Sequence, residues 1–219
     1  MKEINLELVK EGFANGVAKG RPLTVVEKGL MIANAEIAFG HFLDALKVNW
    51  REDPNSDKTP FRVAKAYVND LWAGRYEAPP SITTFPSDGY DGMVFEGGIP
   101  LTSMCSHHHQ TIMGKVHVAY IPGKDSQVIG LSKLNRLVEH FARRGAIQEQ
   151  LTVAIHNAIN QIITDNKGVG VMIEATHNCV QCRGVKHGGA SMKTSKLTGA
   201  FKDDTATRME YYEFVRGYN

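Results

Sequence analysis

The three cysteines of this chain lie in two short clusters that are far apart in the sequence. Residues 105–109 read CSHHH, and residues 177–183 read HNCVQCR. Thiolate and imidazole are the ligands that Zn²⁺ prefers, and the gap of two residues between Cys105 and His108 lets one turn present both groups to one ion. A third ligand from the second cluster would leave the fourth zinc position open to water, as in catalytic zinc sites. The function is therefore expected to depend on how the fold brings the two clusters together.

The composition is that of an ordinary globular protein, with 42% hydrophobic and 22% charged residues. A net charge of +2 does not indicate a nucleic-acid partner. No apolar run approaches the roughly 20 residues that span a bilayer, and the first 20 residues lack the apolar core of a signal peptide. We therefore expect a cytoplasmic protein with no nucleic-acid or membrane partner, whose cysteines serve a metal or catalysis rather than disulfides.

The first part of the chain carries helical signals. Residues 1 to about 22 are polar and predict an adaptable arm or a short helix. Residues 24–47 carry apolar side chains at helical spacing and contain no proline, which predicts a long helix. A second helix is predicted to follow Thr59, which can serve as its N-cap with Pro60 at the first helical position. Gly74 is expected to end this helix.

The second part mixes strand and helix signals. Residues 116–121 alternate and predict a strand. Ser132 can cap a following helix, and residues 151–162 carry apolar side chains at the spacing of a further helix. Residues 168–176 and 208–216 are predicted to form strands.

A boundary near residue 90 separates the two patterns. The N-terminal helical region covers residues 1–90, and the region that mixes strands with helices covers residues 91–219. Strand pairs separated by a pair of helices favour an antiparallel sheet with helices on one face. We therefore expect an α+β fold.

Six segments, spread over roughly residues 24–215, resemble the GTP cyclohydrolase I family in order and spacing. They are residues 59–64 (TPFRVA), 103–108 (SMCSHH), 114–122 (GKVHVAYIP), 129–136 (IGLSKLNR), 148–152 (QEQLT) and 174–179 (EATHNC). The resemblance implies a tunnelling fold, in which a four-stranded antiparallel sheet carries two helices on one face and follows an N-terminal helical region.

The resemblance also implies a reaction and the residues that perform it. Similar proteins hydrolyse the imidazole ring of GTP at C8, release formate and form 7,8-dihydroneopterin triphosphate. Zinc is held at the positions of Cys105, His108 and Cys179, and His107 and His177 match the pair that handles protons. Histidine suits this role because its ordinary pKa is near 6.5.

The substrate contacts are implied in the same way. Glu149 matches the residue that reads guanine, where one carboxylate can accept from both N1–H and the exocyclic amine. Gln148 and the backbone around Ile129 and Leu131 lie beside it in similar proteins. The triphosphate needs several cationic side chains in concert. The matching cationic positions are Arg62, Lys65, Lys133, Arg136 and Arg183. Ser132 matches a hydroxyl contact to the sugar or phosphate.

The family assembles as a decamer of two face-to-face pentamers, in which the sheets of five chains close a barrel. Closing a ring pairs the free edges of a four-stranded sheet, which favours such an assembly. We therefore expect a homo-oligomer whose sites draw residues from more than one chain, with Glu149 facing the zinc of a neighbour.

Two other functions fit the same residues. One is a related tunnelling-fold enzyme acting on a pterin or a deazaguanine, the latter with a free nucleophilic cysteine and no zinc. The other is a non-catalytic, zinc-stabilised oligomer that binds nucleotides. Cys182 is either a fourth zinc ligand or a bystander thiol, and we favour the bystander.

The chain departs from the usual family pattern at several positions near the two clusters. Ser106 stands where glutamate is usual, and Gly145-Ala146 stands where Leu-Gln is usual. Polar side chains replace commonly apolar ones at His109 and Gln110, and Asn178 replaces a usual methionine. These changes leave the implied metal ligands and Glu149 in place.

Overall fold

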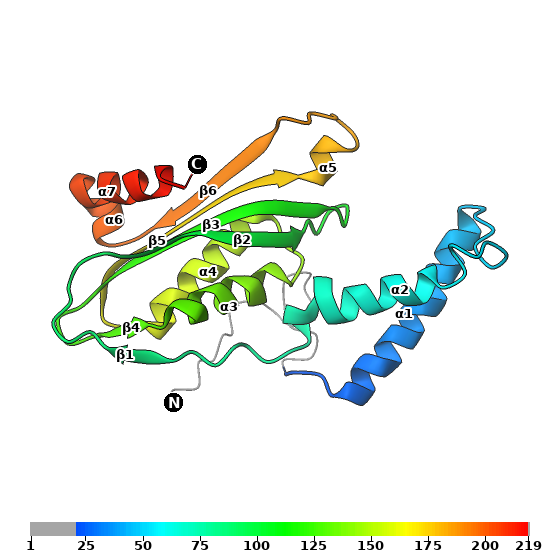
Figure 1. Cartoon of the computed structure of the whole chain (residues 1–219), viewed down its shortest axis with the longest axis horizontal. Coiled ribbons are helices and arrows are strands. Elements are labelled where there is room, and N and C mark those ends of the chain that lie inside the picture. Colours follow the sequence, from blue (N-terminus) through cyan, green and yellow to red (C-terminus); the bar gives the residue numbers. More distant parts are fainter. Residues whose placement is uncertain (1–20, 219) are drawn as a thin grey trace.

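The computed structural model describes residues 21–218, so the arm or short helix expected over the first 20 residues lies outside the described part. At the centre is a four-stranded antiparallel sheet in the order β2-β3-β5-β6. Two helices cover one face of this sheet, a short C-terminal pair lies on the other, and a helical arm extends from one end (Figure 1). The predicted fold class is confirmed: α+β, with a four-stranded antiparallel sheet, two helices on one face and helices before it.

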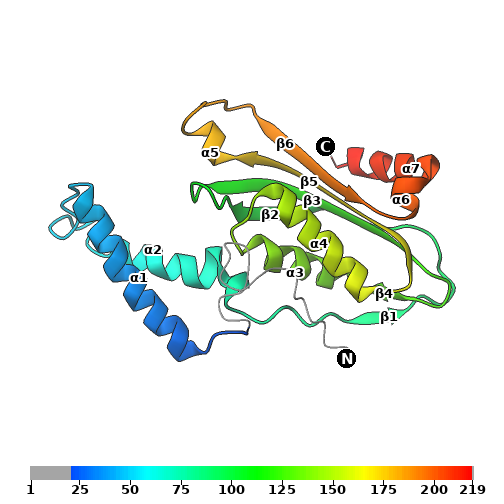
Figure 2. The same ribbon diagram turned by 180° about the vertical axis from the view of Figure 1, so that it is seen from behind.

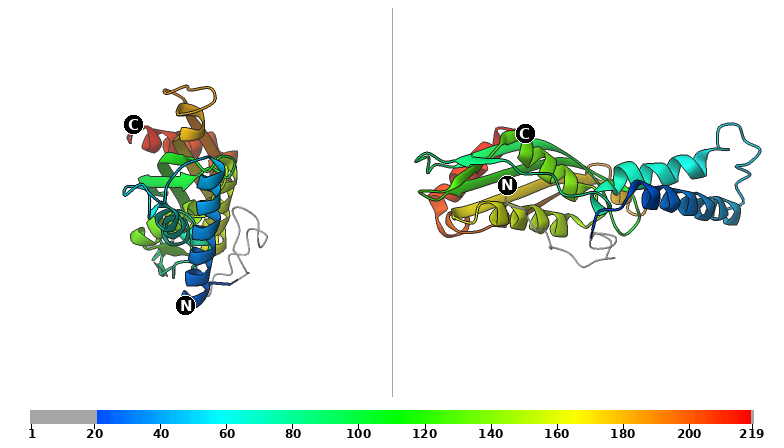
Figure 3. Two further views of the ribbon diagram at one scale, coloured as in Figure 1. Left: turned by 90° about the vertical axis from the view of Figure 1, so that its right-hand side faces the viewer. Right: turned by 90° about the horizontal axis from the view of Figure 1, so that it is seen from below.

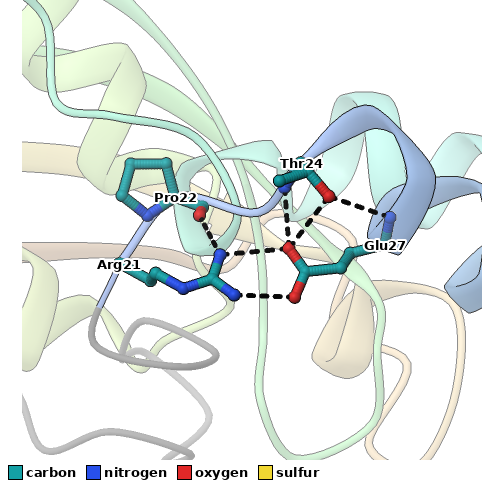
Figure 4. Close-up of polar contacts among 4 residues, drawn as sticks. All are labelled: Arg21, Pro22, Thr24 and Glu27. Carbon is teal, nitrogen blue, oxygen red and sulfur yellow. Dashed lines mark hydrogen bonds and ion pairs between the residues drawn. The ribbon is translucent and has the colours of Figure 1, made fainter.

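The arm consists of α1 (Val25–Ala45) and α2 (Thr59–Ala66), which lie side by side and project along the long axis of the molecule (Figure 3). A capping box begins α1. The Thr24 hydroxyl accepts from the N–H of Glu27, and the Glu27 carboxylate accepts from the N–H of Thr24 (Figure 4). The long helix predicted over residues 24–47 is confirmed.

The second helix begins one residue earlier than the sequence predicts. Thr59 is its first helical residue rather than its N-cap, and Lys58 occupies the cap position without a side-chain hydrogen bond. The reason is that the N–H of Thr59 donates to the carbonyl of Ser56 (2.9 Å), so the loop already turns before it reaches Pro60. Proline is tolerated there because the first N–H groups of a helix have no partner within it.

The chain continues beyond α2 as a π turn, η1 (Tyr67–Leu71), and a 3₁₀ turn, η2 (Ala73–Arg75). The prediction that Gly74 ends the helix is therefore wrong, because α2 and η1 have already ended when the chain enters η2. Gly74 meets a different requirement. A Cβ atom at this position would clash with the carbonyl oxygen of His140 in α3 (Leu131–Ala142). The arm thus meets the body through a close contact between backbones.

The strands of the main sheet are longer than those predicted. The segments predicted over residues 116–121 and 168–176 lie within β3 and β5, whose pairing runs from Ile112 opposite His177 to Pro122 opposite Asn166. The four strands are β2 (Val94–Met104), β3 (Thr111–Pro122), β5 (Asn166–His177) and β6 (Ser191–Leu197). A second, two-stranded sheet pairs β1 (Thr84–Pro86) with β4 (Gln127–Ile129), and α5 (Asn178–Gln181) follows β5.

Helices α3 and α4 (Gln148–Ile162) lie along one face of the sheet (Figure 2). Their apolar faces form the core with the strands, as predicted, through Leu134, Leu137, Val138, Phe141, Leu151, Ile155, Ala158 and Ile159. Ser132, however, is not the cap of α3. Gly130 is, because β4 pairs with β1 as far as Ile129 and the chain turns into the helix directly afterwards. No helix within residues 21–218 is long and apolar enough to cross a membrane.

The strand predicted over residues 208–216 is wrong, because this segment forms α7 (Thr205–Arg216). Two features favour the helix over its aromatic and β-branched composition. The carboxylate of Asp204 accepts from two N–H groups of the first turn. Tyr211 and Val215, four residues apart, are buried on the same side, in the small core that this helix shares with the far face of the sheet.

Candidate active site

The two cysteine clusters meet at one end of the sheet. Cys105 directly follows β2, and Cys179 lies just beyond β5. The register of the strands places both at the same end, because β3 pairs with both β2 and β5. Cys105 is buried, and its thiol is a neighbour of the Cys179 thiol. Burial, and then the neighbouring Cys105, raises the pKa of Cys179. All three cysteines are free thiols.

The turn after Cys105 carries the three consecutive histidines. It is closed by the N–H of Cys105, which donates to the carbonyl of Gln110 (2.9 Å), and by the N–H of His109, which donates back to the carbonyl of Cys105 (3.0 Å). His107 and His108 are both exposed. His108 lines a mostly apolar groove between the turn, α1 and α2.

The structure therefore brings two of the three implied zinc ligands together. Within residues 21–218, no three His, Cys, Asp or Glu side chains are grouped closely enough to hold a metal ion. The donor chemistry nevertheless fits zinc, since two thiols are neighbours and an imidazole stands in the same turn as one of them. His108 has to turn away from its groove to join them.

His177 and Gln148 form the second part of the site. His177 ends β5, and Gln148 begins α4 on the covered face of the sheet. The ring nitrogen Nε2 of His177 lies 2.8 Å from Oε1 of Gln148. Burial lowers the pKa of His177, and the nearby negative charge of Glu149 raises it to a smaller extent. Glu149 itself is exposed on the first turn of α4.

The implied phosphate-binding residues fall into separate places in one chain. Ser132, Lys133 and Arg136 lie on the N-terminal half of α3, towards the end of the sheet that is remote from α5 (Figure 1). A helix of this length spans about 18 Å at 1.5 Å per residue, so these side chains are well separated from the two thiols. Arg62 and Lys65 are exposed on α2, and Arg183 is exposed in the segment after α5.

The backbone expected beside the base lies with the α3 group. Ile129 is buried at the end of β4, and its N–H donates to the hydroxyl of Tyr120 (2.7 Å). Leu131, at the start of α3, is exposed. Within one chain, Ile129 and Leu131 are therefore far from Glu149, which lies at the end of the sheet where Cys105 and Cys179 meet.

Two of the positions that depart from the family pattern, Gln110 and Asn178, contact Cys182 beside the thiol pair. The Cys182 thiol donates to the carbonyl of Asn178 (2.7 Å) and lies 3.7 Å from Oε1 of Gln110. The Asn178 amide donates to the hydroxyl of Thr111. Cys182 is therefore tied to the loop around α5.

His109 joins the turn to the arm through its ring. Its backbone has a positive φ of 51°. The ring packs edge-on against Trp72 at 5.1 Å and tilted against Tyr67 at 5.9 Å, both measured between centroids. The turn that carries His107 and His108 therefore rests on the helical arm.

Two threonines near Gln148 have no role in the sequence-based assignment. Thr152 and Thr194 hydrogen-bond to each other and to Gln148. Thr152 lies in a segment that matches the family pattern, but only their contacts in the fold distinguish the two residues from other threonines.

Comparison with known proteins gives a consistent family match. The family model described as GTP cyclohydrolase I matches residues 35–216. The GTP cyclohydrolase 1 of Corynebacterium glutamicum is 42% identical over 172 residues, which cover 76% of this chain and 86% of the relative. The proteins of the same name from Haemophilus ducreyi (42%; 79% and 78% covered) and Pseudoalteromonas translucida (43%; 76% and 91% covered) are similar to a like extent.

Proposed function

The chain belongs to the GTP cyclohydrolase I family, and on that premise we propose that it hydrolyses the imidazole ring of GTP at C8, releases formate and yields 7,8-dihydroneopterin triphosphate. The observation that carries the proposal is the family match over residues 35–216, which includes every residue assigned to the site. The chain also covers most of the length of relatives named GTP cyclohydrolase 1.

Formate release tests this activity. The zinc-loaded protein is incubated with GTP, and formate and the pterin product are both quantified, with ATP as the matched control substrate. We expect one formate per pterin from GTP and none from ATP. Absence of formate from protein that has bound zinc would contradict the proposal.

We propose that Cys105, His108 and Cys179 hold one Zn²⁺ per chain. The proximity of the two thiols supports this, and so does the position of His108 in the turn that follows Cys105. Bound there, zinc would supply Lewis-acid chemistry for the hydrolysis. Metal analysis of Cys179→Ser should show loss of zinc, whereas Cys182→Ser should retain it. Equal loss in both variants would make Cys182 a ligand.

The other side chains of the site bind the base and move protons. We assign His107 and His177 to proton transfer at the imidazole ring of the substrate, where a group that titrates near neutral pH is most effective. The Glu149 carboxylate accepts from guanine N1–H and the exocyclic amine, and Gln148 lies beside it. The triphosphate is bound by Arg62, Lys65, Ser132, Lys133, Arg136 and Arg183, and the backbone of Ile129 and Leu131 borders the base.

These residues come together only if chains share sites. One chain holds the thiol pair and the basic side chains of α3 at different ends of the sheet, which supports a homo-oligomer, and by family a decamer of two pentamers. Cys179→Ser chains and Arg136→Gln chains, each impaired alone, should recover activity when refolded together, because some shared sites then receive both intact residues. An active monomer, detected by light scattering, would contradict this assembly.

The proposal also covers location and pathway. The three free thiols suit a reducing compartment such as the cytoplasm. The expected product belongs to pterin and tetrahydrofolate synthesis. Loss of the gene should therefore be rescued by a supplied reduced pterin or folate.

A further inference from the structure

The orientation of the Gln148 side chain follows from the groups around it. This side chain is 1% exposed. Its amide nitrogen lies 3.1 Å from the carbonyl of Ile173, 3.0 Å from the carbonyl of Met192 and 3.1 Å from the hydroxyl oxygen of Thr194. Backbone carbonyls only accept hydrogen bonds, so the atom that faces them has to be the NH₂ group. The amide oxygen therefore faces His177.

The threonine hydroxyls support the same orientation independently. Thr152 donates its single hydroxyl hydrogen to the carbonyl of Gln148, at 2.8 Å. The hydroxyl oxygens of Thr152 and Thr194 lie 2.7 Å apart. Because the hydrogen of Thr152 is already used, Thr194 is the donor in this pair. Thr194 is then left with lone pairs that accept from the Gln148 amide.

An amide oxygen can only accept, so it fixes the ring nitrogen opposite. Oε1 of Gln148 lies 2.8 Å from Nε2 of His177, which therefore carries hydrogen. In the neutral ring only one nitrogen is protonated, and the partner of one nitrogen decides the state of the other. His177 then has its lone pair on Nδ1.

We propose that Thr152 and Thr194 are positioning residues that act through Gln148 to hold His177 with hydrogen on Nε2 and the lone pair on Nδ1. The role of this arrangement in catalysis rests on the proposed function. The Nε2–H donates to Oε1 of Gln148, and Nδ1 is left as the acceptor nitrogen of the ring.

Thr194→Val is the informative variant, because it removes one hydroxyl and preserves the shape of the side chain. Gln148 variants cannot separate positioning from substrate contact. We expect kcat for formate release to fall by about 10-fold to 100-fold, the usual cost of losing an outer partner of a site residue, with KM for GTP within about twofold. Thr194→Ser should restore kcat. The matched control is Thr198→Val. It also removes one threonine hydroxyl, which lies 3.0 Å from Nε2 of His156 in α4, the helix that carries Gln148.

A measurement without substrate decides the tautomer. Ring-nitrogen spectra of the zinc-loaded protein labelled with ¹⁵N-histidine distinguish a protonated nitrogen from one with a lone pair, and His177→Asn assigns the signals. We expect Nε2–H in the native protein and a changed signal in Thr194→Val. Hydrogen on Nδ1 in the native protein would overturn the proposal. The proposal would also be overturned if folded Thr194→Val kept both the native kcat and the native ring-nitrogen signals of His177. If the native protein releases no formate, the proposed function fails, but the nitrogen signals still decide this inference.

Discussion

The helical arm and the sheet body contain similar apolar residues and use them in opposite ways. Of the 21 residues of α1 only Gly40 is buried, and Val25, Leu30 and Ile37 are 84%, 62% and 59% exposed. In the body, residues such as Leu137 of α3 are completely buried against the sheet. The body completes its core within one chain, whereas the arm carries apolar surface that one chain leaves uncovered. Patches of this kind are typical of interaction surfaces, which agrees with the proposed assembly.

The largest expected difference between the regions is in stability. Leu137→Ala should lower the free energy of unfolding by about 2–5 kcal/mol, because it opens a cavity in the core. Leu30→Ala should change it by less than about 0.5 kcal/mol in dilute protein, because the side chain is exposed. Urea unfolding measures both. If the destabilisation by Leu30→Ala grows with protein concentration, another copy of the chain covers α1. If Leu30→Ala destabilises as much as Leu137→Ala at every concentration, the distinction between arm and body is wrong.

Substrate binding should also depend more on the body. Glu149→Gln should weaken GTP binding by about 1.5–3 kcal/mol, the value of a charged hydrogen bond, which is roughly a 10-fold to 150-fold rise in Kd. Lys65→Gln on the arm should cost about 0.2–1 kcal/mol, since exposed ion pairs contribute little. Calorimetric titration compares the two. A larger effect at Lys65 would make the arm a principal part of the site.

The joint between arm and body should be sensitive to acid. His140 is buried there, and its Nε2 accepts from the Arg144 guanidinium (2.7 Å), whose Nε donates to the carbonyl of Gly74 (3.1 Å). Burial, with a smaller contribution from Arg144, lowers the pKa of His140 to about 3. This is below the ordinary value of about 6.5, so the contribution of neutral His140 is full above pH 6.5 and is lost as pH falls towards 3.

In that range the free energy of unfolding should fall by up to about 1.4 kcal/mol per pH unit on account of His140. His140→Gln keeps an acceptor for Arg144 and should flatten the dependence. Urea unfolding between pH 4 and pH 7 provides the test, and an unchanged slope in the variant would show that His140 does not govern the acid response.

At the start of the arm we expect a smaller effect than in the core of the body. Thr24→Ala removes one half of the capping box and should cost about 1 kcal/mol of helix stability. The carboxylate of Glu27 also pairs with Arg21, which limits the loss (Figure 4). Amide hydrogen exchange should accelerate in the first turns of α1 and stay unchanged in α3. Equal acceleration in both helices would mean that arm and body unfold together.

Periodicity was sufficient for the elements with a regular apolar face. The helix at residues 24–47, the faces of α3 and α4 and the centres of β3 and β5 could all be predicted for this reason. Strand β2 was missed because Gly97, Gly98 and Pro100 interrupt its pattern, and it carries a bulge at the glycines. The polar alternation of β6 gave no strand signal. At α7 the aromatic composition concealed residues spaced four apart.

The site was less accessible to sequence than the fold. The ligand types were evident, but the meeting of Cys105 with Cys179 depends on strand register. The place of His108 depends on a turn whose backbone direction is set by contacts with the arm. The hydrogen bonds of Gln148 involve β5 and β6, so nothing near it in the sequence indicates that its amide is directed at a histidine.

The pairing of β3 with β5 also fixes when the site can exist. During synthesis, the Cys105 turn leaves the ribosome long before Cys179 and His177 do. Strand pairs with such a large sequence separation close late, because the entropy of the intervening loop opposes them. A nascent or truncated chain therefore displays Cys105 and His108 without Cys179, and His107 without His177. The proposed metal binding and proton transfer therefore both require the completed sheet.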